Sequence, residues 1–434
     1  MAIHQVLEHN RTIDWVEARH PKWLSTPLAR ELTMGTLRHV FTLTAAVDGH
    51  LQRPLKPKDR ILHALMLVGA YQLAYTNVKD HAAIHETVAA CRTVGRPWAT
   101  RLVNAVLRNL QRNTPTNHKR SFDHFDHPDW LIELLASQYE DHDKLLQANN
   151  TRAPMSLRVN LARTSRGDYQ RALDNAGIEY EPGASENGDE ACLVLKQAQR
   201  AETLPGWTEG EVAVQDRGAQ LAASVLWPRL KESHKAIHRL LDACAAPGGK
   251  LFHLTELCAA HDVALEATGL DHSAQRQAAT RTIGERLGHR SGLLTGDATS
   301  RDWWDGKPFD VILLDAPCSG TGTLRRHPDI KVLLTPQKLE EHCRLQARLL
   351  RNLWSLLTPG GTLLYCTCSV LEQENDLIVE AFVDEAPSAV ISPVALPTGR
   401  PTRRGWQLLP TDPTTDGFYV SLLEKPRTTE ADAP

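Results

Sequence analysis

Two cysteines stand one residue apart in the segment YCTCSV, residues 365–370, at the end of a run of apolar residues. Side chains alternate between the two faces of a strand, so the thiols of Cys366 and Cys368 can point to the same face. Such thiols could pack in a core, form half of a metal site, or include a reactive group. A zinc site would need two further ligands, and the sequence contains no C-x-x-C partner, so no metal is predicted.

A third thiol lies in a similar position. The segment LLDAPCSGTG, residues 313–322, is an apolar run that ends in turn-forming residues, among them Asp315 and Cys318. The segment RRHPDIK, residues 325–331, follows it. Its cationic and hydrogen-bonding groups suit contact with a phosphate or a base.

The segment LLDACAAPGGK, residues 240–250, predicts a strand that runs into a glycine-rich turn before a helix. Gly248 and Gly249 would let a ligand approach the backbone, and the helix would offer free N–H groups. The spacing is neither G-x-G-x-x-G nor G-x-x-x-x-G-K-[ST]. A dinucleotide site and a P-loop are therefore disfavoured.

Two acids close the next two apolar runs. Asp271 ends ATGLD about 20 residues after the glycines, where a carboxylate can accept hydrogen bonds from ribose hydroxyls. Asp297 ends LLTGD, one predicted strand later, where it could meet an adenine amino group. Glycines and acids in this order predict a nucleoside-bearing cofactor that lies across the strand ends.

These motifs stand at the ends of apolar runs that alternate with helical stretches from about residue 211 to 424. The clearest helix is predicted over 336–357, and a last strand over 416–425. The alternation predicts an α/β fold, a doubly wound, Rossmann-like parallel sheet with helices on both faces. Ligands in that fold bind at the carboxyl ends of the strands. The apolar runs are HRLLDACA, ALEATGLD, SGLLTGD, FDVILLDAP and GTLLYCTCS.

Residues 1–112 carry helical rather than strand periodicity, which predicts an all-α bundle. The segment TRLVNAVLRNLQR, residues 100–112, is one such helix. Another is predicted over 37–48, with one face made of Leu37, Val40, Phe41 and Thr44.

Charge is unevenly distributed along the chain. Residues 1–120 hold 17 Lys and Arg against 8 Asp and Glu, a surplus of +9, whereas the whole chain carries −3. A basic module suggests a polyanion partner such as nucleic acid. A solvated surface that happens to be basic is the alternative.

Composition and termini predict a cytoplasmic protein. The eight cysteines are dispersed, which fits reduced thiols rather than a disulfide framework. The start of the chain has no apolar signal region. The longest mainly apolar run, residues 61–75, is shorter than the roughly 20 residues of a membrane span, so no membrane partner is predicted.

The chain is too long for a single core, and the pattern of predicted secondary structure changes twice along it. A polar stretch with two prolines, residues 112–128, predicts a linker. Two short strands around a helix that ends at Gly177 then predict a small α/β module. We expect a helical domain over 1–125, the module over 126–210, the doubly wound domain over 211–425 and a disordered tail over 426–434.

The motifs DACAAPGGK, DAPCSGTG, RRHPDIK and YCTCSV, in this order, resemble those of the RNA 5-methylcytosine methyltransferases, which use S-adenosylmethionine. The resemblance covers residues 211–424. The segments HAAIHETVAACRTVG and LVNAVLRNLQR resemble the NusB-type RNA-binding domain. The resemblance implies an enzyme that methylates carbon 5 of a cytosine in ribosomal RNA, with small-subunit 16S rRNA as its partner. We expect a monomer.

The resemblance also implies roles for individual residues. Cys368 would be the nucleophile that bonds to the cytosine, Cys318 would help to release the product, and Asp315 would lie between the methyl donor and the base. Asp271 would hold the ribose hydroxyls and Asp297 the adenine. The methionine and ribose end of S-adenosylmethionine would be held by Cys244, Ala245, Ala246, Pro247, Gly248, Gly249 and Lys250. Cys366, two residues inside the strand, is interpreted as a packed core thiol.

The chain departs from the family in one place. After the Gln-Asp of VQDRGAQLAA the family usually has small or hydroxyl residues, whereas this chain has Arg217 and Gly218. Two other functions are the alternatives. A methyltransferase for amines or small molecules commonly carries Asn/Asp-Pro-Pro-aromatic where this chain has Asp-Ala-Pro-Cys. A non-catalytic RNA-binding factor would not need Cys368 and Cys318.

Overall fold

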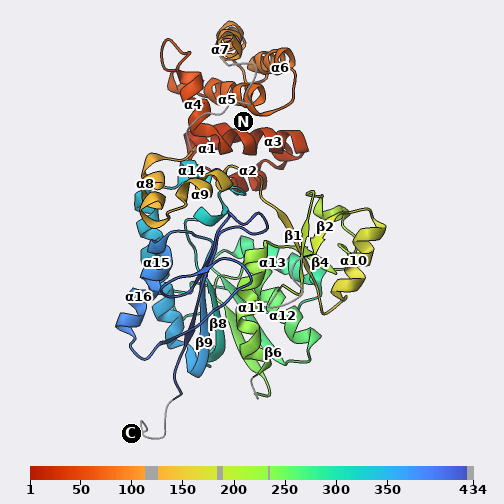
Figure 1. Ribbon diagram of the computed structural model, residues 1–434, viewed down its shortest axis with the longest axis vertical. Coiled ribbons are helices and arrows are strands. Elements are labelled where there is room, and N and C mark those ends of the chain that lie inside the picture. Colours follow the sequence, from red (N-terminus) through yellow and green to blue (C-terminus); the bar gives the residue numbers. More distant parts are fainter. Residues whose placement is uncertain (113–125, 183–188, 233–234, 428–434) are drawn as a thin grey trace. The chain divides into compact units, whose positions relative to one another are not determined.

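The computed structural model describes residues 1–112, 126–182, 189–232 and 235–427, and Figure 1 traces them in sequence order. They form two compact units, of which the first comprises Met1–Arg152 with Leu324–Thr335 and the second Ala153–Thr323 with Pro336–Pro434. Most of the predicted linker and residues 428–434 of the predicted tail lie outside the described residues. No helix in the described ranges is long and apolar enough to cross a membrane.

The first unit is helical, as the periodicity predicts. One core joins α4 to α7 and includes Leu67, Val103 and Val106, while a second core joins α1, α2 and α3. The helices are α1 (Ala2–His9), α2 (Ile13–Arg19), α3 (Pro27–Arg38), α4 (Val40–Asp48), α5 (Ile61–Tyr75), α6 (Asp80–Thr93), α7 (Thr100–Arg112), α8 (Asp129–Gln138), α9 (His142–Asn149) and α14 (Ile330–Leu333).

The single helix predicted over residues 37–48 is wrong, because the chain breaks at His39 between α3 and α4. The cause is a residue far away in the chain. Asp126 accepts a hydrogen bond from the backbone N–H of Thr42 (2.8 Å) and lies 3.0 Å from Nδ1 of His39. It thereby caps the first turn of α4, whose buried face includes Leu43 rather than Phe41.

The segment Leu324–Thr335 belongs to the first unit, although it contains the motif RRHPDIK. The carboxylate of Asp329 accepts a hydrogen bond from the backbone N–H of Ile13 (3.0 Å). The ammonium of Lys331, 1 % exposed, donates to the carbonyl of Arg38 (3.0 Å). Three of its charged groups, Arg325, Asp329 and Lys331, are buried, so the expectation that the whole motif faces a phosphate or a base is corrected.

The second unit contains two sheets. The smaller is antiparallel, in the order β2-β3-β1-β4, with strands β1 (Met155–Val159), β2 (Tyr180–Pro182), β3 (Cys192–Leu195) and β4 (Val212–Val214). Helix α10 (Arg166–Asn175) packs on it through Tyr169 and Leu173. Gly177 follows that helix with φ +67°, the left-handed conformation that commonly ends a helix.

The larger sheet is mainly parallel, in the order β11-β12-β13-β9-β8-β5-β6-β7, with β10 beside β13. Neighbours from β5 to β9 pair in parallel and β13 runs antiparallel to β9. The predicted doubly wound α/β fold is thus confirmed. The strands are β5 (His238–Asp242), β6 (Leu265–Asp271), β7 (Gly292–Thr295), β8 (Phe309–Asp315), β9 (Leu357–Thr367), β10 (Val390–Ser392), β11 (Arg400–Pro401), β12 (Trp406–Leu408) and β13 (Phe418–Glu424).

Helices cover both faces of this sheet. Helices α15 (Pro336–Ser355) and α16 (Asp376–Glu385) pack on one face, and α11 (Arg217–Lys231) and α12 (Gly249–Ala260) on the other (Figure 1). Successive residues of β9 alternate between the two cores, with Tyr365 in the first and Cys366 in the second. Helix α13 (Ala274–Leu287) connects β6 to β7.

The two unusual residues at the start of α11 have structural partners. The side chain of Asp216 caps α11 by accepting a hydrogen bond from the N–H of Gly218 (2.8 Å). Arg217 forms an ion pair with the fully buried Asp189 and donates to the hydroxyl of Thr414 (2.7 Å). A Cβ atom at Gly218 would lie 2.8 Å from the hydroxyl oxygen of Thr415, so the close packing there favours glycine.

Candidate active site

The thiols of Cys318 and Cys368 meet at the carboxyl ends of two neighbouring parallel strands. β8 and β9 pair with Asp315 opposite Cys366, so the turns that follow both strands emerge side by side. The Sγ atoms of Cys318 and Cys368 lie 3.4 Å apart, and both side chains are half-buried. Cys366 is fully buried in the core, as interpreted from the sequence.

The surroundings of Cys318 act on the pKa of its thiol. The hydrogen bond with Cys368, together with burial, raises the pKa of Cys318 well above the ordinary value. A raised pKa favours the protonated form of the Cys318 thiol. Either sulfur can be the donor of the hydrogen bond between them.

A buried carboxylate fixes the turn that carries Cys318. Glu374, fully buried, accepts hydrogen bonds from the backbone N–H of Ser319 (2.8 Å), from the hydroxyl of Ser319 and from the amide of Gln346 (3.0 Å). Gln346 also donates to the carbonyl of Pro317 (2.9 Å). Sequence reasoning missed Glu374, because nothing in the sequence sets it apart from Glu372 and Asp376, which follow the same strand.

Asp315 forms an ion pair with Lys250. The ammonium of Lys250 donates to Oδ2 of Asp315 at 2.6 Å, and Oδ1 of Asp315 lies 3.8 Å from the thiol of Cys366. Burial lowers the pKa of Lys250, but the carboxylate of Asp315 outweighs it, and the pKa is raised above its ordinary value. The structure thus places the ammonium of Lys250 against the carboxylate of Asp315.

The glycine-rich turn leads directly into α12. Gly248 has φ +95°, and a Cβ atom there would come within 2.3 Å of the ring of Phe252, so glycine is required. Gly249 begins the helix, whose first N–H groups have no intrahelical partners. Of the other predicted residues in the turn, Ala245 and Ala246 are buried, Cys244 is half-buried and Pro247 is exposed.

The two predicted cofactor acids differ in exposure. Asp271 ends β6, is 2 % exposed, and accepts a hydrogen bond from the N–H of Ser273 (2.9 Å). The guanidinium of Arg276 lies 3.4 Å from its other oxygen and donates to the carbonyl of Ala246 (2.6 Å). Asp297 is exposed, and hydrogen bonds from the N–H and hydroxyl of Thr299 lower its pKa.

Asp242, at the end of β5, was missed by sequence reasoning. It is 1 % exposed, and its Oδ1 has no hydrogen-bond partner. Burial, followed by repulsion from Asp315, raises its pKa to about 7. Its position as the acid immediately before a glycine-rich turn was the available signal.

A second missed residue, Arg158, lies in β1 of the smaller sheet. Its guanidinium, 1 % exposed, forms two hydrogen bonds with Glu256 of α12, at 2.7 and 2.8 Å. It also donates to the carbonyl of Gly249 (2.6 Å) and to the side chain of Gln215. The smaller sheet therefore holds the start of α12 in place.

Three models of known protein families match the sequence of this chain. The family model for 16S rRNA methyltransferase RsmB/F matches residues 228–424, and the NusB family model matches 24–112. The model of a Methyltr_RsmF/B-like, ferredoxin-like domain matches 127–202. The unit boundary at Arg152 divides that range, so the domain bounds 126 and 210 remain a prediction.

Ribosomal RNA small subunit methyltransferase B from Vibrio cholerae is 39 % identical over 404 residues, which cover 92 % of this chain and 89 % of that one. The protein of the same name from Shewanella oneidensis is 38 % identical and covers 98 % and 97 %. The chain belongs to the ribosomal RNA small subunit methyltransferase B family. The predicted methyltransferase enzyme with a NusB-like domain is confirmed by this membership.

Solved structures share the fold of this methyltransferase B family member. The crystal structure of PH0851 matches with a TM-score of 0.81, 22 % identity and 98 % coverage of both chains. The crystal structure of NSun6 from Pyrococcus horikoshii with SFG matches with a TM-score of 0.59 and 19 % identity, covering 69 % of this chain and 99 % of that one. No cluster of three or more metal-ligating residues occurs in the described part of the chain.

Proposed function

We propose that this methyltransferase transfers a methyl group from S-adenosylmethionine to carbon 5 of a cytosine in 16S rRNA, through a covalent bond between Cys368 and the base. The observation that carries the proposal is the 3.4 Å contact between the sulfur atoms of Cys318 and Cys368 at the carboxyl edge of the sheet. Methylation of an amine needs no covalent thiol, whereas methylation of carbon 5 does. The RNA substrate is supported by the names of the relatives and by the basic first part of the chain.

Addition of Cys368 to the ring would make carbon 5 nucleophilic. Its thiolate adds to carbon 6, an S–C bond forms, and N3 gains a proton or hydrogen bond as charge develops on the ring. Carbon 5 would then have enamine character and take the methyl group, while the electron pair of the broken S–CH3 bond would stay on the donor sulfur as a neutral thioether. When carbon 5 loses its proton, the ring double bond returns and the bond to Cys368 breaks.

Cys318 would act in the last of these steps. As a thiolate, its sulfur would accept the carbon-5 proton, directly or by relay to a further base. The 3.4 Å contact between the two sulfurs supports this role, because it puts Cys318 next to Cys368. Glu374 holds the turn of Cys318 in position. The target base must be unstacked for the sulfur to reach carbon 6.

The residues at the strand ends fit a nucleoside-bearing cofactor. S-adenosylmethionine supplies a methyl group on a positively charged sulfur, which no side chain provides. The backbone of the turn 244–250 would hold its methionine and ribose end, Asp271 the ribose hydroxyls and Asp297 the adenine. Asp315 would separate the methyl donor from the cytosine. The unpartnered buried oxygen of Asp242 supports a polar ligand beside the same turn.

Tritium release tests the proposal. RNA that carries tritium on carbon 5 of cytosine should lose one tritium for each methyl group gained. Methyl transfer without release would indicate an amine or ribose target. No transfer at all to small-subunit rRNA or to its ribonucleoprotein particle would indicate a non-catalytic factor. Bisulfite sequencing of cellular 16S rRNA with and without the gene would identify the nucleotide.

A further inference from the structure

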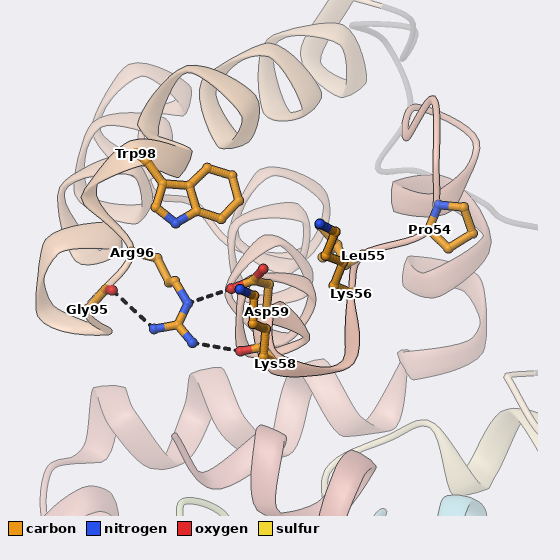
Figure 2. Close-up of a pocket in the computed structure, with 8 residues that line it drawn as sticks. All are labelled: Pro54, Leu55, Lys56, Lys58, Asp59, Gly95, Arg96 and Trp98. Carbon is orange, nitrogen blue, oxygen red and sulfur yellow. Dashed lines mark hydrogen bonds and ion pairs between the residues drawn. The ribbon is translucent and has the colours of Figure 1, made fainter.

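The helical unit contains a surface pocket of about 600 Å³ that the proposed chemistry does not use (Figure 2). Two segments form it: the chain before and within the short helix η2 (Pro57–Asp59), and the turn that leads from α6 into η3 (Pro97–Ala99). A pocket of this size can enclose a small organic group. It is lined by Pro54, Leu55, Lys56, Lys58, Asp59, Gly95, Arg96 and Trp98.

Arg96 joins the two segments and fixes the floor of the pocket. Its guanidinium donates to Oδ1 of Asp59 (2.7 Å), to the carbonyl of Lys58 (2.7 Å) and to the carbonyl of Gly95 (3.1 Å). Asp59 is only 7 % exposed. The charges of Arg96 and Asp59 therefore neutralise one another, and the ion pair holds the two segments of the pocket together.

The walls of the pocket carry exposed groups that are not held by such an ion pair. The indole of Trp98 is 60 % exposed, which is unusual for so large an apolar side chain. Lys56 and Lys58 are exposed, and neither has an ion-pair partner among the residues that the structure describes. Figure 2 shows Trp98 on one side of the pocket and Lys56 on the other, with the pair of Arg96 and Asp59 below the space between them in this view.

We infer that this pocket binds an unpaired nucleotide of the RNA substrate, with its base stacked on Trp98 and the flanking phosphates held by Lys56 and Lys58. An aromatic face beside free cations is the combination that binds single-stranded nucleic acid. Double-stranded RNA keeps its bases stacked inside the helix, so an exposed indole would find no partner there. The inference rests on the proposed function, since it takes the RNA substrate as the ligand.

Direct binding of RNA to the full-length chain tests the inference without requiring methylation. The probe is a labelled single-stranded fragment of 16S rRNA, followed by fluorescence anisotropy at several salt concentrations. Trp98→Ala should weaken binding by about 5- to 150-fold, the range for one lost stacked base, without changing the salt dependence. Trp98→Phe should restore most of the affinity.

The lysines should behave differently from the tryptophan. The double variant Lys56→Ala/Lys58→Ala should reduce the slope of log affinity against log salt by roughly 1.4, because each phosphate contact on a single strand contributes about 0.7. Leu28→Ala and Lys22→Ala, exposed residues of the same unit outside the pocket, should change neither affinity nor slope.

Three outcomes would overturn the inference. The first is that Trp98→Ala binds the fragment as tightly as Leu28→Ala. The second is that the variants weaken binding to an RNA duplex equally. The third is unchanged binding to naked RNA but weakened binding to the ribonucleoprotein particle, which would assign the pocket to a protein partner. A chain that binds RNA through Trp98 but releases no tritium would contradict the proposed function and leave this pocket assignment intact.

Discussion

The sulfur atoms of Cys318 and Cys368 lie 3.4 Å apart, although 50 residues separate them in the chain. Parallel pairing of β8 with β9 brings them together, because both cysteines follow the carboxyl ends of these strands. Both are free thiols in the structure. The hydrogen bond with Cys368, together with burial, raises the pKa of Cys318.

The two thiols should fail in opposite ways when they are replaced. Cys368→Ala removes the atom that would attack carbon 6, so neither methyl transfer nor a covalent RNA adduct should form. Cys318→Ala leaves attack and transfer possible but impairs loss of the carbon-5 proton. The methylated RNA should therefore stay bonded to Cys368, and denaturing electrophoresis should show a protein–RNA band.

Cys366→Ala is the matched control for the thiol variants. It removes a small, fully buried group two residues away, so it should lower stability while leaving turnover without a trapped adduct. An adduct in the Cys368 variant and none in the Cys318 variant would reverse the two roles. Full activity in both variants would show that these cysteines only pack in the core.

Asp271→Ala should weaken the binding of S-adenosylmethionine. The carboxylate would lose charge-assisted hydrogen bonds to the ribose, worth about 1.5–3 kcal/mol, or roughly 10- to 150-fold in affinity. Isothermal titration calorimetry measures this directly. Glu285→Ala, an exposed acid on the helix that follows, serves as the control. Unchanged affinity in the Asp271 variant would show that the ribose lies elsewhere.

Asp242 should make the stability of the chain depend on pH. In the folded chain its pKa is raised from 3.8 to about 7, so between these values the folded state binds more protons than the unfolded state. The free energy of unfolding contributed by this group must therefore fall as the pH rises through this window. Asp242→Asn removes the titration, so its stability relative to the wild type should increase between about pH 4 and about pH 7.

Urea unfolding of both proteins across that window measures the difference. The carboxylate of Asp315 raises the pKa of Asp242, whereas the ammonium of Lys250 lowers it. The variant is therefore compared with the wild type at each pH under the same conditions. A difference in stability that does not change with pH would show that Asp242 is ionised in the folded chain throughout this range.

Arg158 and Glu256 should show strong energetic coupling. Both are 1 % exposed, so Arg158→Met leaves a buried carboxylate without its partner, at a cost of about 3–5 kcal/mol. Replacing both residues with methionine should cost much less than the sum of the two single variants, because no buried charge remains unpaired. A double-mutant cycle from urea unfolding measures the coupling, and simple additivity would contradict it.

Local patterns were sufficient for most elements but not for contacts between distant residues. The strands of the large sheet are continuous apolar runs with polar ends, so both their position and the edge that carries the cysteines could be predicted. The break at His39 could not, since Asp126 caps α4 from far along the chain. Glu374 and Arg158 were missed for the same reason: their partners are set by the tertiary fold, and their own neighbours in sequence give no periodic signal.

The return of Leu324–Thr335 to the first unit has a consequence for synthesis of the protein. Leu333 belongs to the same core as Ile13 and Val16, so that core is incomplete until residue 335 has left the ribosome. At ~5–20 residues per second, about 180 further residues delay this by roughly 10–40 s after the first 152 have been made. During that interval the helices of the first unit have been synthesised, but Leu333 has not. Their apolar residues would therefore be accessible to a ribosome-associated chaperone before Leu333 can cover them.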